Sequence, residues 1–125
     1  MAARIYDFVQ KLAKRTAEGR LNWERTETDG EYQASFPSYS VRILVRETAA
    51  QNSEDVAVQI FGEDGALVED FTDVDVALAS ENMMNGQQAF RFMSQLHKDA
   101  RRKAMGVDKA LDDLMKSLGD DDVPF

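Results

Sequence analysis

The sequence contains no cysteine, which excludes disulfide bonds and thiol chemistry. It contains one histidine, His97, so a zinc site or a Ser-His-Asp triad would have to depend on that single imidazole. It also contains no apolar run long enough to predict a membrane span, and its first residues lack the apolar core of a signal peptide. We therefore expect a cytoplasmic protein.

Motifs for enzymatic chemistry are also missing. No serine lies in a nucleophile-elbow context, and the glycines form no phosphate-binding loop. The acidic turn at residues 63–65 lacks the ligand spacing of a calcium-binding loop. Asp112 and Asp113 are neighbours on a predicted helix and are expected to face water. We predict that the protein is not an enzyme and uses no metal or cofactor.

What is present is an uneven charge. The chain has 125 residues, the size of one domain, and a net charge of −8. Residues 26–87 and 110–125 are acidic, with net charges of −11 and −4, whereas residues 1–25 and 88–109 are basic at +3 and +4. Both basic segments coincide with predicted helices, which allows a local basic surface on an acidic protein.

Hydrophobic periodicity predicts an α+β fold. Apolar residues recur at helical spacing near both ends of the chain, and they alternate with polar residues at a period of two in the segments between. Asp29-Gly30 and Glu63-Asp64-Gly65 mark turns. Short turns between sequence-adjacent strands favour an antiparallel meander of about five strands, with one N-terminal helix and two C-terminal helices packed on it. The expected helices cover residues 3–18, 83–104 and 108–118, and the expected strands cover residues 21–25, 32–36, 39–47, 55–61 and 67–71.

Several boundaries follow from single residues. Gly19 is expected to end the first helix, and Gly106 is expected to break the C-terminal helical region, with Asp108 capping the restart. Residues 48–54 are expected to form a polar connection, and residues 72–81 show no decisive pattern. The final helix has an apolar stripe of its own, and the whole segment 1–119 is predicted to be one domain.

The last six residues are the most specific feature of the chain. They read Asp120, Asp121, Asp122, Val123, Pro124 and Phe125, and we call them the tip. Adjacent aspartates repel one another, and proline cannot continue a helix, so the tip is predicted to be a disordered acidic segment. A partner could bury the Phe125 ring, pair its carboxylate with a cation, and attract the aspartates to a basic surface.

The tip resembles the C-terminal tip of bacterial single-stranded DNA-binding proteins, which is usually Asp-Asp-Asp, an aliphatic residue, Pro and Phe. In that family the tip docks onto helicases, exonucleases, recombination mediators and a clamp-loader-associated subunit. The resemblance implies that Phe125 is the anchor, that Pro124 packs beside it, and that the three aspartates contact a basic ridge. It covers six residues, and Gly119 alone separates the tip from the final helix, whereas the family has a long linker there.

Nucleic-acid binding is an alternative function. Lys98, Arg101 and Arg102 are predicted to share a helix face, and four aromatic residues could stack on bases if they were exposed: Trp23, Tyr32, Phe36 and Tyr39. Against this, the isoelectric point of about 4.6 lacks the basic character of nucleic-acid binders, and the expected strand order lacks the helix that the OB barrel places after its third strand.

These observations lead to three hypotheses. The first is a bacterial or phage adaptor or regulator of DNA replication and repair, whose tip binds the proteins that read the single-stranded DNA-binding protein tail. The second is a divergent single-stranded DNA-binding protein with its own tip. The third is an interaction protein that dimerises through its Met- and Leu-rich final helices and carries an incidental acidic tail.

Overall fold

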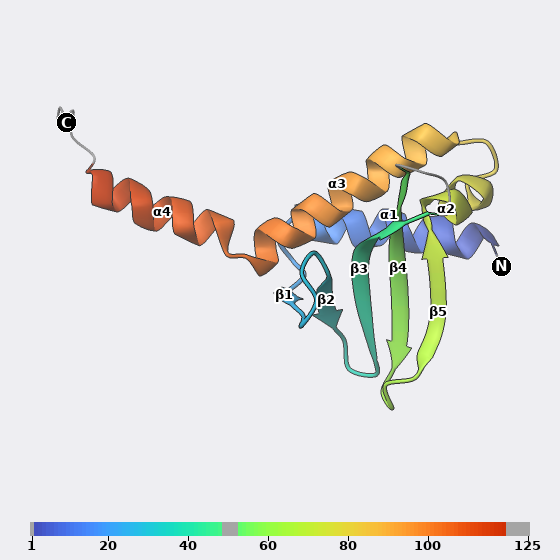
Figure 1. Cartoon of the computed structure of the whole chain (residues 1–125), viewed down its shortest axis with the longest axis horizontal. Coiled ribbons are helices and arrows are strands. Elements are labelled where there is room, and N and C mark those ends of the chain that lie inside the picture. Colours follow the sequence, from blue (N-terminus) through green and yellow to red (C-terminus); the bar gives the residue numbers. More distant parts are fainter. Residues whose placement is uncertain (1, 49–52, 120–125) are drawn as a thin grey trace.

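A five-stranded antiparallel sheet forms one layer of the molecule, and helices cover one of its faces (Figure 1). The computed structural model describes residues 2–48 and 53–119. The strands follow one another in the order β1-β2-β3-β4-β5. Their bounds are β1 Trp23–Arg25, β2 Tyr32–Ser35, β3 Tyr39–Glu47, β4 Glu54–Gly62 and β5 Leu67–Thr72, and the helices are α1 Ala2–Ala17, α2 Asp73–Ala79, α3 Gly86–Ala104 and α4 Val107–Leu118.

The predicted meander is confirmed. Each strand pairs antiparallel with its neighbour in sequence, and the register places Tyr32 opposite Ile43 and Ile43 opposite Val58. Gly30 and Gly65 adopt left-handed backbone conformations with φ of 80° and 84°, as their turns require. The connection predicted at residues 48–54 lies partly outside the described residues.

Helix α1 ends where the sequence predicts. Gly19 has φ of 72°, and its N–H donates to the carbonyl of Thr16 while the N–H of Arg20 donates to that of Arg15. This pair of bonds is the Schellman arrangement, which satisfies carbonyls at the end of a helix and needs a left-handed residue at the position of Gly19. The turn redirects the chain from α1 into the first strand.

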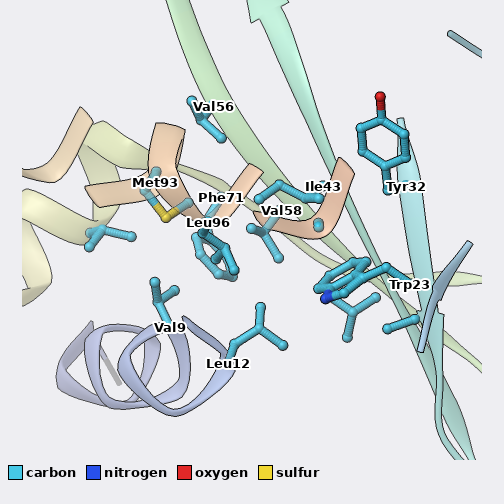
Figure 2. Packing of buried hydrophobic residues seen from close by; sticks show 14 of the residues in the cluster. Val9, Leu12, Trp23, Tyr32, Ile43, Val56, Val58, Phe71, Met93 and Leu96 are labelled. Atoms are coloured by element: carbon cyan, nitrogen blue, oxygen red, sulfur yellow. The ribbon is translucent and has the colours of Figure 1, made fainter. Parts of the chain in front are cut away.

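The core lies between the sheet and the helices α1, α2 and α3 (Figure 2). Val9 and Leu12 of α1 and Met93 and Leu96 of α3 meet the inward side chains of the strands. Trp23 is 2% exposed, and its indole N–H donates to the Thr16 hydroxyl over 3.0 Å. The one polar atom of this large side chain is thus satisfied within the core.

The helices differ from the prediction at three points. Residues 73–79 form α2, whose capping box uses Thr72 and Asp75, and the next helix begins at Gly86 rather than near Met83 because Asn85 caps it. Asp108 does not cap α4. Gly106 occupies the N-cap position with φ of 66° and makes no side-chain cap bond.

The two C-terminal helices differ in their packing. Helix α3 packs on the sheet and buries Ala89, Met93, Leu96 and Ala100. Helix α4 buries no residue and projects away from the sheet (Figure 1). The expectation that both helices pack on the sheet therefore holds for α3 and is wrong for α4.

Candidate interaction surfaces

The tip is attached at the far end of the projecting helix. Residues 120–125, including Phe125, lie outside the described residues, so the geometry ends at Gly119. Gly119 directly follows α4 and has φ of 86°. The twelve residues of α4 span ~18 Å at 1.5 Å per residue. The tip therefore begins about one helix length away from the point where α4 leaves the body.

Helix α4 carries an uncovered apolar stripe. Four large apolar side chains recur at helical spacing and are 48–63% exposed: Leu111, Leu114, Met115 and Leu118. We call this set the α4 stripe. Polar and charged residues occupy the remaining faces, and Lys109 pairs with Asp113 over 2.8 Å. Exposed apolar faces of this kind are typical of interaction surfaces.

The junction between α3 and α4 consists of Met105 and Gly106. The left-handed conformation of Gly106 changes the chain direction, and the guanidinium of Arg102 donates to the Asp108 carboxylate over 2.9 Å across the turn. Both side chains are more than half exposed, so this ion pair contributes little to stability. The direction of α4 is therefore set mainly by the backbone at Gly106.

The predicted basic cluster is present on α3. Lys98, Arg101 and Arg102 are all exposed and lie on the side of the helix opposite its buried residues. Arg102 forms an ion pair with Asp108. The structure thus brings the three cations to one surface, with one of them paired to a carboxylate.

The proposed aromatic stacking residues divide into two groups. Trp23 and Tyr32 are core residues, at 2% and 5% exposed, whereas Phe36 and Tyr39 are 39% and 53% exposed. The exposed pair lies at the β2–β3 turn, with Phe36 directly after β2 and Tyr39 at the start of β3. Burial therefore contradicts the stacking role for Trp23 and Tyr32, because their rings already face the core.

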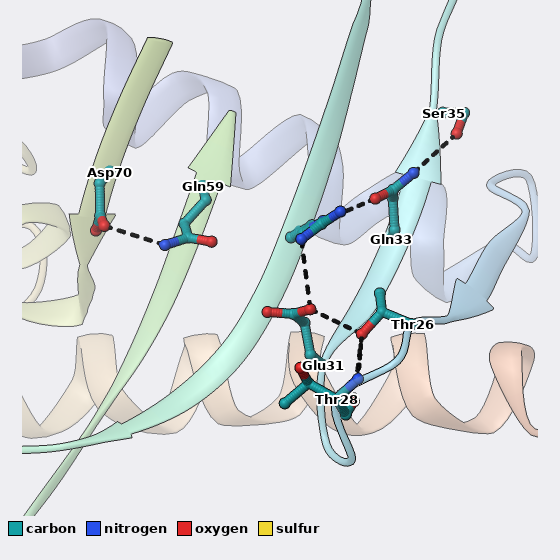
Figure 3. A network of polar contacts seen from close by, with 8 residues as sticks. Thr26, Thr28, Glu31, Gln33, Ser35, Gln59 and Asp70 are labelled. Carbon is teal, nitrogen blue, oxygen red and sulfur yellow. Dashed lines mark hydrogen bonds and ion pairs between the residues drawn. The ribbon is translucent and has the colours of Figure 1, made fainter. Parts of the chain in front are cut away.

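A polar network covers the face of the sheet that carries no helix (Figure 3). Arg42 donates to Gln33 over 2.7 Å, lies 3.6 Å from the Glu31 carboxylate, and stacks over the Phe61 ring at 4.9 Å. Glu31 also accepts a hydrogen bond from Thr26 over 2.7 Å. An open hollow of about 510 Å³ is bordered by Thr26, Glu31, Gln33 and Arg42. Sequence reasoning did not predict the network, because its members come from separate segments of the chain.

Two aspartates have perturbed ionisation. The pKa of Asp70 is lowered by its hydrogen bonds from Arg46, at 2.9 Å and 3.2 Å, and the pKa of Arg46 is correspondingly raised. Burial raises the pKa of Asp73, although its carboxylate accepts the N–H of Val56 over 2.8 Å. Asp73 links the start of α2 to β4, and Asp70 with Arg46 links β5 to β3, so each has a structural partner.

His97 has a structural contact as well. Its Nε2 lies 2.7 Å from the carbonyl oxygen of Gly30, and its ring lies 5.3 Å from that of Tyr32. It joins α3 to the β1–β2 turn. Among residues 2–48 and 53–119, no group of three or more His, Asp or Glu side chains has the arrangement of a metal site. Within the same residues, no helix is both long and apolar enough to cross a membrane.

The chain was compared with protein-family models, curated proteins and solved structures, and none of these comparisons gives a match. The functional interpretation therefore depends on the residues of the chain itself: the tip, the projecting helix that carries it, and the exposed cations of α3.

Proposed function

We propose that the protein is a non-enzymatic adaptor whose tip docks onto genome-maintenance proteins that read the tail of single-stranded DNA-binding protein. The observation that carries the proposal is the tip itself. All six residues, Asp120 to Phe125, follow the family pattern of three aspartates, an aliphatic residue, Pro and Phe. The proposal assigns the anchor role to Phe125 and the role of electrostatic attraction to the three aspartates.

The projecting helix supports this proposal. In the family a long linker separates the tip from the folded domain, and here α4 provides the separation instead. A helix holds the tip at ~18 Å from the α3 end at a lower entropic cost than a flexible linker of equal span, because fewer backbone conformations are lost on binding. The body can then hold one ligand while the tip binds another protein.

A competition assay tests the proposal. A labelled peptide of the family tail is bound to a tail-pocket protein and challenged with the 125-residue chain. We expect the intact chain to displace the peptide, and we expect deletion of Phe125 to weaken displacement at least ~30-fold, since anchor residues contribute ~2 kcal/mol or more. Equal displacement with and without Phe125 would contradict the anchor role.

Two matched variants separate the contributions of the tip. One additional residue after Phe125 keeps the ring but moves the carboxylate, and it should also abolish displacement. Replacement of Asp120, Asp121 and Asp122 by Asn keeps the anchor and should weaken displacement mainly at low salt. No displacement by any form of the chain would refute the adaptor proposal.

A second candidate function is binding of single-stranded nucleic acid, and the observation that favours it is the exposed group Lys98, Arg101 and Arg102 on one face of α3. Contacts between cations and phosphates predict oligonucleotide binding that falls steeply with salt. Neutralising the three cations should abolish that binding, while replacing Lys109 on α4 should not. Absence of binding at low salt would exclude this candidate.

A further inference from the structure

Two apolar surfaces of the chain are open in the same molecule. The first is the α4 stripe. The second is a groove between α1 and α3 that contains a hollow of about 310 Å³, bordered by apolar side chains from both helices: Ala13, Ala17, Phe92 and Leu96. We call it the α1–α3 groove. Both surfaces would lose apolar contact with water if they met.

The groove has the length of α4. A second hollow of about 190 Å³, whose border is mostly polar, adjoins the first, since Ala17 and Asp99 border both. It extends to Lys103 of α3 and to Asp108 in the first turn of α4. The α3 residues along the groove thus run from Phe92 to Lys103, a distance of ~17 Å at 1.5 Å per residue. Helix α4, with twelve residues, spans ~18 Å.

From this match we infer that the α1–α3 groove binds the α4 stripe of a second copy of the chain, in a symmetric dimer that exchanges its α4 helices. In this structure α4 points away from its own groove (Figure 1). A twofold axis near Gly106 brings α4 of one copy antiparallel to α3 of the other. Each copy then supplies one helix and one groove, so both open surfaces are covered at once.

Interface size favours exchange over a direct α4–α4 contact. Stable interfaces bury ~1,200 Å² or more. A direct contact would use one twelve-residue helix from each copy once and would leave both grooves open. Exchange forms the helix–groove contact twice, once on each side of the twofold axis. It therefore buries four surfaces, both stripes and both grooves, whereas the direct contact buries two.

Charge also matches between the two surfaces. The groove is bordered by three cations, Lys14, Arg102 and Lys103, and by two carboxylates, Asp99 and Asp108. Helix α4 carries three aspartates and two lysines, a net charge of −1, and three further aspartates follow it in the tip. The opposite signs of these small net charges give a modest long-range attraction between the two surfaces.

Mass measurement by light scattering is the first test. The full-length chain should reach twice the 14.1 kDa of one chain as its concentration rises. Leu114→Asp places a charge in the α4 stripe and should return the protein to monomer, whereas Ser117→Asp adds the same charge beside the stripe and should leave the dimer intact. Ala17→Glu blocks the groove from an exposed position and should also give monomer.

Disulfide cross-linking identifies the contact. Because the chain has no cysteine of its own, an introduced cysteine can pair only with another introduced cysteine. Leu118→Cys and Gln95→Cys are made in separate chains and the two proteins are mixed under oxidation. Gln95 borders the groove, and an antiparallel pairing about Gly106 places residue 118 near it. Exchange predicts a mixed 95–118 disulfide between two chains.

Other results would overturn the inference. A monomer at every concentration, or a dimer unaffected by both Leu114→Asp and Ala17→Glu, would do so. Disulfides only between two copies of Leu118→Cys would indicate a direct α4–α4 contact instead. If a chain carrying both cysteines forms its disulfide only within itself, α4 folds back into its own groove and no exchange occurs.

Discussion

Helices α3 and α4 are adjacent in the chain and similar in pattern, yet they have opposite environments. Each has an apolar stripe at helical spacing. The α3 stripe is buried on the sheet, and Met93 and Leu96 are at most 1% exposed. In α4 the corresponding residues are about half exposed. An amphipathic pattern predicts that a helix has an apolar face but does not say which surface covers it.

The comparison extends to the two parts of the molecule. The body, residues 2–104, has a continuous core, and no buried side-chain nitrogen or oxygen in the described residues lacks a hydrogen bond. The arm, α4, depends on α3 alone for its contacts within one chain. The body therefore contains the core of the fold, whereas the apolar residues of the arm remain exposed.

The largest expected effect comes from the core of the body. Phe71→Ala removes a ring that is 2% exposed and packs edge-on against Phe8 at 6.5 Å. The cavity should lower the free energy of unfolding by ~3–5 kcal/mol, measured by urea denaturation. Leu78→Ala is the control, because Leu78 is 76% exposed and should change stability by less than ~0.5 kcal/mol. Equal effects of the two variants would contradict the assigned core.

The next effect tests a buried polar contact. Thr16→Val removes the hydroxyl that accepts the Trp23 indole N–H over 3.0 Å and leaves that donor buried. We expect a loss of ~1–3 kcal/mol in the free energy of unfolding. Thr16→Ser keeps the hydroxyl and should retain most of the stability. Thr16→Ser removes only the methyl group of Thr16. If Thr16→Val and Thr16→Ser lower the free energy of unfolding equally, the hydrogen bond is not the main contribution of this side chain.

A smaller effect is expected at the open sheet face. Arg46 and Asp70 form a two-bond pair that is 30–40% exposed, so solvent reduces its contribution, and a double-mutant cycle with Arg46→Met and Asp70→Asn should give a coupling of ~0.2–1 kcal/mol. The folded pKa of Asp70 is lowered. Its contribution is therefore full above the ordinary carboxyl pKa and is lost as pH falls through the folded pKa. A coupling that grew at low pH would contradict the pairing.

The smallest effect should come from removing the arm. Deletion of residues 107–125 removes no buried side chain among the described residues. At protein concentrations where the intact chain is monomeric, the free energy of unfolding should change by less than ~0.5 kcal/mol. A loss of several kcal/mol would show that α4 belongs to the core of the body, and the distinction between arm and body would fail.

Much of this architecture follows from local sequence. Asp29-Gly30, Gly19 and the alternating strands predict the meander and the end of α1, because these signals depend on backbone conformation within a few residues. Helix α2 was not predicted. Its N-cap residue, Thr72, is also the last residue of β5, so no turn separates the strand from the helix. A helix of seven residues is also too short to show a clear period.

The sequence by itself determined the fold class, the basic face of α3 and the composition of the tip, since each is a property of neighbouring residues. Only the tertiary structure decided that Trp23 and Tyr32 are core residues, that α4 projects uncovered, and that a groove of matching length lies between α1 and α3. Burial depends on contacts between distant segments, and the periodicity of one segment does not say which other segment covers its apolar face. The clearest case is that α3 and α4 have similar apolar stripes, of which the α3 stripe is buried and the α4 stripe is exposed.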